Sequence, residues 1–306
     1  MLAFVVRRLL LSVPVLFGVA TLVFSLIHLV PGDPAAAMLG ESASPADLED
    51  LRSKLGLDRP FLAQYGHYLA GLVSGDLGTS FRYGTPVGRE ITQRLGATTE
   101  LAVVAMAVAI VIALPLGILG ALYRGRAVDQ AAMTVSLAGI AMPNFWLGPL
   151  LAIIFSVQLG WLPVSGTGTW RHLVLPAVTL GAALAAMTAR MTRASLIDEL
   201  GELYVLAAEA RGVSRLGAVI RHALRNSLIP VVTIVGLQLG SVLTGTIITE
   251  TIFSWPGVGR LLIQAISFRD YPLVQGCILL IAVTYVAMNL IVDVLYAWLD
   301  PRIRYQ

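Results

Sequence analysis

Charged side chains are scarce in this sequence. Only 13% of its 306 residues are Asp, Glu, Lys or Arg, whereas 57% are hydrophobic, and the mean hydropathy is +0.81. Soluble domains carry about 25% charged residues. The composition therefore indicates an integral membrane protein whose first partner is the lipid bilayer.

Residue types that usually serve in catalysis or in metal and phosphate binding are also few. The chain has one cysteine, Cys277, and one lysine, Lys54, which lies between Ser53 and Leu55 and so belongs to no phosphate-binding Gly-Lys-Ser/Thr loop. The four histidines are scattered, and the sequence contains no HExxH, CxxC or GxSxG. Metalloprotease, redox and hydrolase functions are excluded at this level, and a membrane-embedded enzyme is disfavoured. We expect no catalytic residue, no bound metal and no cofactor in this chain.

Six long apolar runs free of charge divide the sequence. A helix needs about twenty residues to cross a ~30 Å hydrocarbon core, and the runs, each close to that length, are 9–30, 101–123, 131–159, 172–189, 227–249 and 271–292. The third is longer than a span requires, which predicts tilt or a break near Pro143. The first is too long for a signal peptide core of 7–15 residues. We therefore expect an all-α membrane protein with six transmembrane helices, residues 1–30 holding the first.

The charge of the loops predicts the orientation. With the N-terminus inside, the inner segments hold 12 of the 21 basic residues but only 7 of the 18 acidic ones. The positive-inside rule then places both termini in the cytoplasm. The basic pI of about 9.2 follows from this topology and needs no nucleic acid partner.

Two loops are large. Residues 31–100 form an expected extracytoplasmic helical cap, in which Ser44 caps a helix that begins at Pro45, and 60–76 form a second helix. The remaining membrane-embedded core, with the second to sixth spans, is expected over 101–306. Its loop 190–226 is expected in the cytoplasm, with a helix over 198–210, a break at Gly212 and a second helix from Ser214 to about residue 228.

Polar and small residues inside the spans suggest a pathway. The candidates are Asn144 in the third span and Gln238, Ser241, Thr244 and Gly245 in the fifth. Two alternatives stay open: close helix packing through the GxxxG pair Gly236 and Gly240, and a kink at Pro143 that only shapes the bundle. We expect Asp293 to pair with a cytoplasmic arginine rather than to relay protons.

Eleven short stretches, taken in order, resemble one family. They are "PGDP" (31–34), "LGLDRPFLAQY" (55–65), "GDLGTS" (75–80), "MPNFWLG" (142–148), "LGWLPVSG" (159–166), "HLVLPAVTLG" (172–181), "ARGVS" (210–214), "RHALRNSLIP" (221–230), "ETIFSWPGVGRLL" (250–262), "RDYPLVQG" (269–276) and "LYAWLDPRIR" (295–304). The chain resembles the inner-membrane permease subunits of ABC importers for dipeptides and oligopeptides, over nearly all of its length.

The resemblance implies a type I importer permease in the bacterial inner membrane. Its partners would be a second homologous permease, two ABC ATPase subunits that bind ATP and Mg²⁺, and an extracytoplasmic peptide-binding protein. The coupling loop that docks on the ATPases would include Ala207, Ala208, Glu209, Ala210, Arg211, Gly212, Val213, Ser214 and Arg215. Leu206 stands where the family's "EAA" motif has its glutamate, and Glu209 is displaced from that position.

On the outer side, the expected contacts for the binding protein are Tyr65, Trp255 and Pro256. Dipeptides or oligopeptides are the expected cargo. Nickel chelates, glutathione and oligosaccharides are alternatives, because the residues expected along the path are small and neutral. A secondary transporter working alone would need titratable groups for ion coupling, and the six runs contain no Asp, Glu, Lys or Arg.

Overall fold

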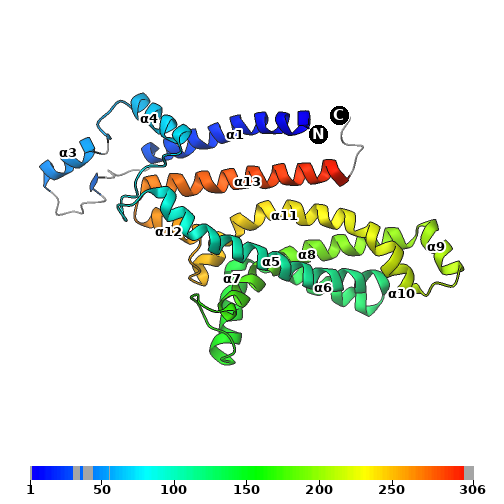
Figure 1. Ribbon diagram of the computed structural model, residues 1–306. Coiled ribbons are helices and arrows are strands. Elements are labelled where there is room, and N and C mark those ends of the chain that lie inside the picture. The colour runs from blue at the N-terminus through cyan, green and yellow to red at the C-terminus, as the bar shows by residue number, and fades with distance from the viewer. Residues whose placement is uncertain (1, 30–34, 37–43, 55, 300–306) are drawn as a thin grey trace.

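The computed structural model describes residues 2–29, 35–36, 44–54 and 56–299 (Figure 1). Apart from an isolated bridge between Thr79 and Pro86, these residues form helices, turns and loops. In chain order the elements are α1 (Leu2–Leu29), α3 (Pro45–Lys54), α4 (Phe61–Ser74), α5 (Val87–Leu122), α6 (Ala127–Ala141), α7 (Asn144–Ala152), the π-helix η1 (Ile153–Gln158), α8 (Trp170–Leu200), α9 (Leu203–Ala210), α10 (Arg215–Ala218), the π-helix η2 (Val219–Ala223), α11 (Leu224–Ile252), α12 (Val258–Ser267) and α13 (Tyr271–Leu299).

Within the residues that the structure describes, five continuous helices are long and apolar enough to cross a membrane. They lie within α1, α5, α8, the run from α10 into α11, and α13. A sixth span is present if the bent pair formed by α6 and α7–η1 counts as one. The structure is thus the all-α, multi-pass fold that the apolar runs predict. In Figure 1, α1 begins and α13 ends at the same end of the bundle.

The third apolar run breaks at Pro143. The helical axis bends by 104° between the segments Ala127–Ala141 and Asn144–Gln158, and α7 leaves the bundle sideways in Figure 1. A residue that precedes proline is disfavoured in the helical region, and Met142 is extended, with φ −92° and ψ 112°. The predicted break is confirmed, although the bend is much larger than that of a simple kinked span.

Small residues bring α5 and α8 into close contact. A Cβ added to Gly117 of α5 would lie 2.7 Å from the carbonyl oxygen of Ala189, and one added to Gly181 of α8 would lie 2.7 Å from that of Ala105. Ala105 and Ala189 are themselves fully buried. Because lipid provides no hydrophobic drive between helices, such close backbone approach is how membrane helices gain packing energy. This helix pair is the centre of the bundle.

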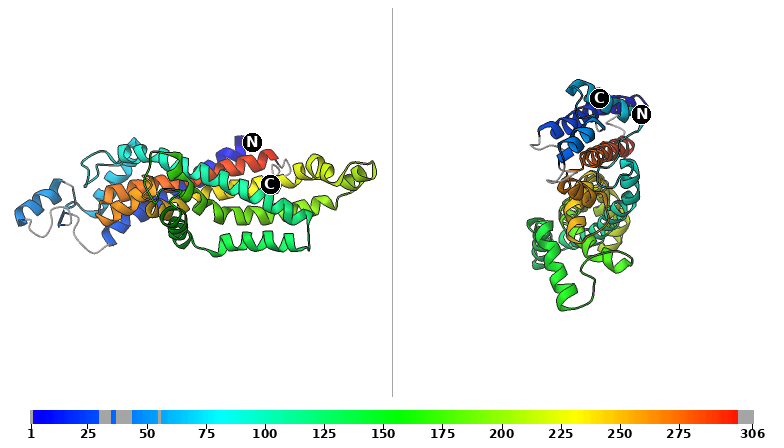
Figure 2. Two further views of the ribbon diagram at one scale, coloured as in Figure 1. Left: turned by 90° about the horizontal axis from the view of Figure 1, so that it is seen from below. Right: turned by 90° about the vertical axis from the view of Figure 1, so that its left-hand side faces the viewer.

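Helix α13 joins two neighbours through contacts that the sequence suggested. Gly236 and Gly240 of α11 face it, since a Cβ added there would lie 3.3 Å from Val292 and 3.4 Å from Tyr285. The GxxxG packing interpretation is confirmed. On its other side α13 lies beside α1 (Figures 1 and 2), and Arg8 pairs with Asp293 at 2.9 Å. The predicted arginine partner of Asp293 is confirmed.

The helix at 45–54 follows its predicted capping pattern. The amide of Asp47 donates to Oγ of Ser44 at 3.2 Å, and that hydroxyl donates back to the Asp47 carboxylate at 2.6 Å. Gly56, two residues after the end of α3, has a positive φ of 67°. Helices α3 and α4 lie at the end of the molecule opposite to α9 and α10 (Figure 1). We call these two ends the cap end and the elbow end.

Candidate functional site

The elbow, residues 203–218, consists of α9, a turn at Gly212 and α10. Gly212 has φ +88°, a left-handed conformation that suits glycine. The amide of Gly212 donates to the carbonyl of Glu209 at 2.9 Å, and the amide of Val213 donates to that of Ala208 at 3.2 Å. This pair of hydrogen bonds is the Schellman motif that ends many helices. The predicted helix break at Gly212 is confirmed.

The second half of the elbow is also capped as predicted. The amide of Gly217 donates to Oγ of Ser214, which places Ser214 at the N-cap of α10. The chain then continues through η2 into α11 without a break, and a single helical run leads from the elbow to Ile252. The helix that starts at Ser214 therefore extends far beyond residue 228.

The first half differs from the prediction of one helix over 198–210. Helix α8 runs to Leu200 and stops at Gly201, and Glu202 is extended, with φ −72° and ψ 144°, before α9 begins. Glycine is among the weakest residues in a helix interior, so Gly201 is a natural place for the interruption. As a result, α9 is a separate short helix set at the end of α8.

Apolar contacts hold α9 to the bundle from one side. Val205 and Ala208 are each 1% exposed, and Val205 packs in a cluster with Leu196 of α8 and Ala218 of α10. Ala208 is one of the expected docking residues, and its side chain faces the interior of its own chain rather than the exposed face of the elbow. The spacing of Val205 and Ala208, three residues apart, puts both on one face of the helix.

Two side-chain hydrogen bonds of Tyr204 also attach α9 to the bundle. The Tyr204 hydroxyl donates to the carboxylate of Glu199 at the end of α8 and accepts from Nδ2 of Asn226 in α11 at 3.0 Å. Burial raises the pKa of Tyr204, and the bond to Glu199 raises it further. The phenol therefore stays neutral near pH 7 and links three helices.

The opposite face of the elbow is exposed. Leu203 is 82% exposed and Leu206 48%, and both lie on α9. The elbow residues that the sequence singled out are also exposed, apart from Ala208 and the half-buried Val213: Ala207, Glu209, Ala210, Arg211, Gly212, Ser214 and Arg215. Tyr204 and Leu216, which the sequence reasoning did not single out, are exposed as well. The sequence reasoning missed Leu203, although its position, five residues before Ala208, places it away from the buried face.

The two candidate path residues whose side chains the structure describes, Gln238 and Asn144, lie in different environments. Gln238 is 8% exposed, and its Nε2 donates to the carbonyl of Leu184 at 3.2 Å while its Oε1 accepts from Thr188 at 3.1 Å. Both partners belong to α8, so Gln238 joins α11 to α8 and does not point into an open path. Asn144 is half-buried at the start of α7. The side chains of Ser241, Thr244 and Gly245 lie outside the described residues.

The outer candidates occupy different environments. Trp255 is 5% exposed and donates from Nε1 to the carbonyl of Ala97 at 2.8 Å, so it is a core residue and is not available as a surface anchor. Tyr65 is half-buried, with its hydroxyl 2.6 Å from Oγ1 of Thr21 and its ring beside Phe24 of α1. Of the three expected contacts for a binding protein, Pro256 is exposed.

Two buried carboxylates near the cap end were not identified from the sequence. Glu250 is fully buried and accepts from Oγ1 of Thr98 at 2.7 Å and from the amide of Arg260 at 3.0 Å. Asp270 is also fully buried and accepts from Oγ of Ser80 and from the amide of Phe81. The signal for both was an acidic residue set directly beside an apolar segment, where an unpaired charge would be costly.

Solved structures show the same fold. A chain of the inward-facing MetNI methionine ABC transporter superposes with a TM-score of 0.57, at 18% identity, over 68% of this chain and 95% of that one. A chain of an amino acid ABC transporter determined with histidines superposes with a TM-score of 0.52, at 16% identity, over 70% and 94%. The chain therefore has the fold of a type I importer permease.

Sequence comparisons extend the similarity to the whole chain. It is 47% identical to the glutathione transport system permease protein GsiC of Escherichia coli O6:H1 and 46% identical to those of Escherichia coli K12 and Shigella dysenteriae, over 100% of both chains in each case. Residues 1–102 match the N-terminal component of binding-protein-dependent transport system membrane proteins. Residues 113–305 match the main component. The chain belongs to the family of binding-protein-dependent transport system inner membrane components and is an ABC importer permease subunit.

Proposed function

We propose that this permease forms the path through which glutathione, or a short peptide of similar size and charge, enters the cytoplasm. The observation that carries this choice of cargo is the 46–47% identity to glutathione permeases over the full length of both chains. Glutathione was one of the alternatives to a general dipeptide or oligopeptide cargo. It now takes precedence over that cargo and over nickel chelates and oligosaccharides.

The elbow is the proposed contact with one of the two ATPase subunits of the assembly. The support is its combination of a fixed attachment and an exposed face: Val205 and Tyr204 hold α9 to the bundle, while the apolar side chains of Leu203 and Leu206 are exposed. An exposed apolar patch on a polar segment is typical of a protein interface. Arg211 adds a charge contact that salt would weaken.

The transport cycle follows from this arrangement. ATP binding in the partner subunits would bring together the elbows of this chain and of a second homologous permease in a heterodimer. The helices would then rock between inward-facing and outward-facing states as rigid bodies. An extracytoplasmic binding protein would deliver the cargo to the cap end, where Pro256 and the outer faces of α3 and α4 are exposed. This orientation, with both termini and the elbow in the cytoplasm, rests on the loop charges.

The experiment reconstitutes the permease pair with its ATPases and binding protein in liposomes that contain ATP. Uptake of labelled glutathione and of a labelled dipeptide is measured in parallel. We expect saturable glutathione uptake that requires both ATP and the binding protein. If only the dipeptide were taken up, the cargo would be a dipeptide and not glutathione. Glutathione uptake without ATP would favour a secondary transporter.

A further inference from the structure

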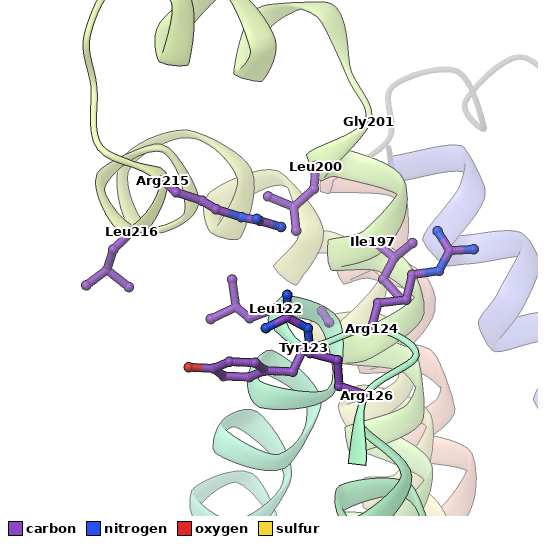
Figure 3. A pocket seen from close by; sticks show the side chains of 10 residues that line it. Leu122, Tyr123, Arg124, Arg126, Ile197, Leu200, Gly201, Arg215 and Leu216 are labelled. Carbon is purple, nitrogen blue, oxygen red and sulfur yellow. The ribbon is translucent and has the colours of Figure 1, made fainter. Parts of the chain in front are cut away.

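A pocket of about 670 Å³ opens beside the elbow. Its walls come from three places in the chain: the end of α5 with the turn that follows it, the end of α8, and the start of α10. Figure 3 shows Arg215 reaching in from α10 and Arg126 facing it from the turn after α5. We call it the arginine pocket, and the residues on which the following argument depends are Leu122, Arg124, Arg126, Ile197, Leu200 and Arg215.

The cationic side of the pocket has no acidic partner in the described part of the chain. Arg124, Arg126 and Arg215 are exposed, and none of them forms an ion pair with a described carboxylate. The nearby acid, Asp129, is 4% exposed and is occupied by Arg193, with which it forms bonds of 2.6 and 2.7 Å. Figure 3 shows the guanidinium groups of Arg126 and Arg215 facing each other across the cavity, whereas that of Arg124 is directed away from it. The facing pair creates a positive potential that attracts an anion.

The turn that carries Arg124 and Arg126 is fixed in place. The Gly125 amide between them donates to Oδ2 of Asp129 at 2.9 Å, and Gly125 adopts the left-handed φ of 76°. Because Asp129 also holds Arg193 of α8, the turn is tied to the same helix that supplies Ile197 and Leu200 to the pocket. The cationic and apolar walls are therefore positioned before any ligand arrives.

The apolar side distinguishes this pocket from a simple anion site. Leu122, Ile197 and Leu200 line it together with the arginines. Leu122 is also the last residue of the apolar span of α5, so the pocket lies where a membrane helix ends and charged residues begin. An anionic phospholipid has both matching parts, a phosphate for the arginines and a chain for the leucines, and basic pockets between membrane helices are known to suit such head groups.

We propose that the arginine pocket binds the phosphate head group of an anionic phospholipid from the adjoining leaflet. The lipid would bridge the turn after α5 and α10, and so steady the elbow against the bundle. In the orientation given under the proposed function, this is the cytoplasmic leaflet. The inference rests on the proposed function only for this identification of the leaflet. The lipid-binding measurement does not depend on the cargo.

The test measures the thermal stability of the full-length chain in a neutral detergent. Short-chain phosphatidylglycerol, short-chain phosphatidylcholine and inorganic phosphate are titrated separately. We expect phosphatidylglycerol alone to raise the Tm in a saturable manner. Arg126→Gln/Arg215→Gln should weaken its apparent affinity by roughly 30-fold, because each arginine near a lipid surface contributes about 1 kcal/mol.

The matched control is Arg221→Gln/Arg225→Gln. It removes the same charge from exposed arginines on the same helical run outside the pocket, and it should leave the affinity unchanged. Equal stabilisation by inorganic phosphate would overturn the lipid assignment in favour of a free-anion site. Equal stabilisation by the two phospholipids, or an unchanged affinity in Arg126→Gln/Arg215→Gln, would also overturn it.

Discussion

Thr98 of α5 and Glu250 at the end of α11 form a buried pair at the cap end. Oγ1 of Thr98 donates to the Glu250 carboxylate at 2.7 Å and accepts from the amide of Val258 at 2.8 Å. The same carboxylate accepts from the amide of Arg260 in the first turn of α12. It also fills the space beside Gly257, where a Cβ would lie 2.2 Å from it. Glu250 thus caps α12 from another helix and fixes the loop 253–257.

Replacement of Glu250 should loosen this loop. Glu250→Ala leaves the Thr98 hydroxyl and the α12 amides without an acceptor, which costs about 1–3 kcal/mol. We expect a lower Tm in detergent and weaker stimulation of ATP hydrolysis by the binding protein. Glu250→Gln keeps an acceptor oxygen and the side-chain shape, so its loss should be smaller. An unchanged Tm in Glu250→Ala would show that the pair does not stabilise the loop.

Gly212→Trp tests the elbow. A Cβ at Gly212 would meet nothing within 4 Å, so the cost within this chain is the left-handed backbone alone, roughly 1–2 kcal/mol. The chain should still insert in the membrane. The bulky ring should instead disturb the partner surface, so that the ATPases are released or hydrolyse ATP without transport.

The matched control at this position is Gly212→Asn, because asparagine tolerates the left-handed region and is small. It should retain most of the uptake. The measurement compares the ATPases that co-purify with each variant and the cargo uptake of the same cells. Normal uptake with tryptophan at position 212 would exclude the elbow as the coupling element.

Leu203→Glu tests the docking face of α9. The side chain is 82% exposed, so a charge there should leave the fold and the Tm intact. At an apolar interface the buried charge would be costly, and the ATPases should dissociate on purification. Glu202→Gln, one residue earlier and also exposed, serves as the control. Retention of the ATPases by both variants would place the contact elsewhere.

Gly117→Ala tests the packing of α5 on α8. The added methyl group would lie 2.6 Å from Cβ of Thr192 and 2.7 Å from the Ala189 carbonyl oxygen. Overpacking of this kind costs about 1–3 kcal/mol. We expect a lower Tm and less protein in the membrane. Gly18→Ala in α1, where a Cβ meets nothing within 4 Å, should behave like the wild type.

Cysteine labelling tests the orientation. The one native cysteine, Cys277, is fully buried, so it should not react with a membrane-impermeant maleimide. Ser44→Cys should label in intact cells, and Ser214→Cys should label only after the membrane is opened. Labelling of both from outside would contradict the predicted topology.

Local signals in the sequence predicted much of the fold. The Ser44 and Ser214 caps, the glycine at 212, the break at Pro143 and the pairing of Asp293 depend on a few neighbouring residues or on a charge in an apolar run. The interruption at Gly201 also had a local signal, the glycine itself, which the sequence reasoning did not use. The burial of Trp255 and the inward position of Ala208 depend on which helices pack together, and the sequence pattern carries no such information. Gln238 illustrates the difference: its polarity suggested a path, but its partners on α8 satisfy it within the bundle.

The unbroken helical run from Arg215 to Ile252 limits where insertions and deletions can be tolerated in the sequence. Gly236 and Gly240 must face α13 while Gln238 faces α8, and the elbow and Glu250 lie near its two ends. One inserted residue between Arg225 and Gly236 would turn everything after it by about 100° relative to the elbow. The glycines would then leave α13, or the elbow would rotate away from its partner. Insertions and deletions should therefore be tolerated in the loop 159–169, but not in this run.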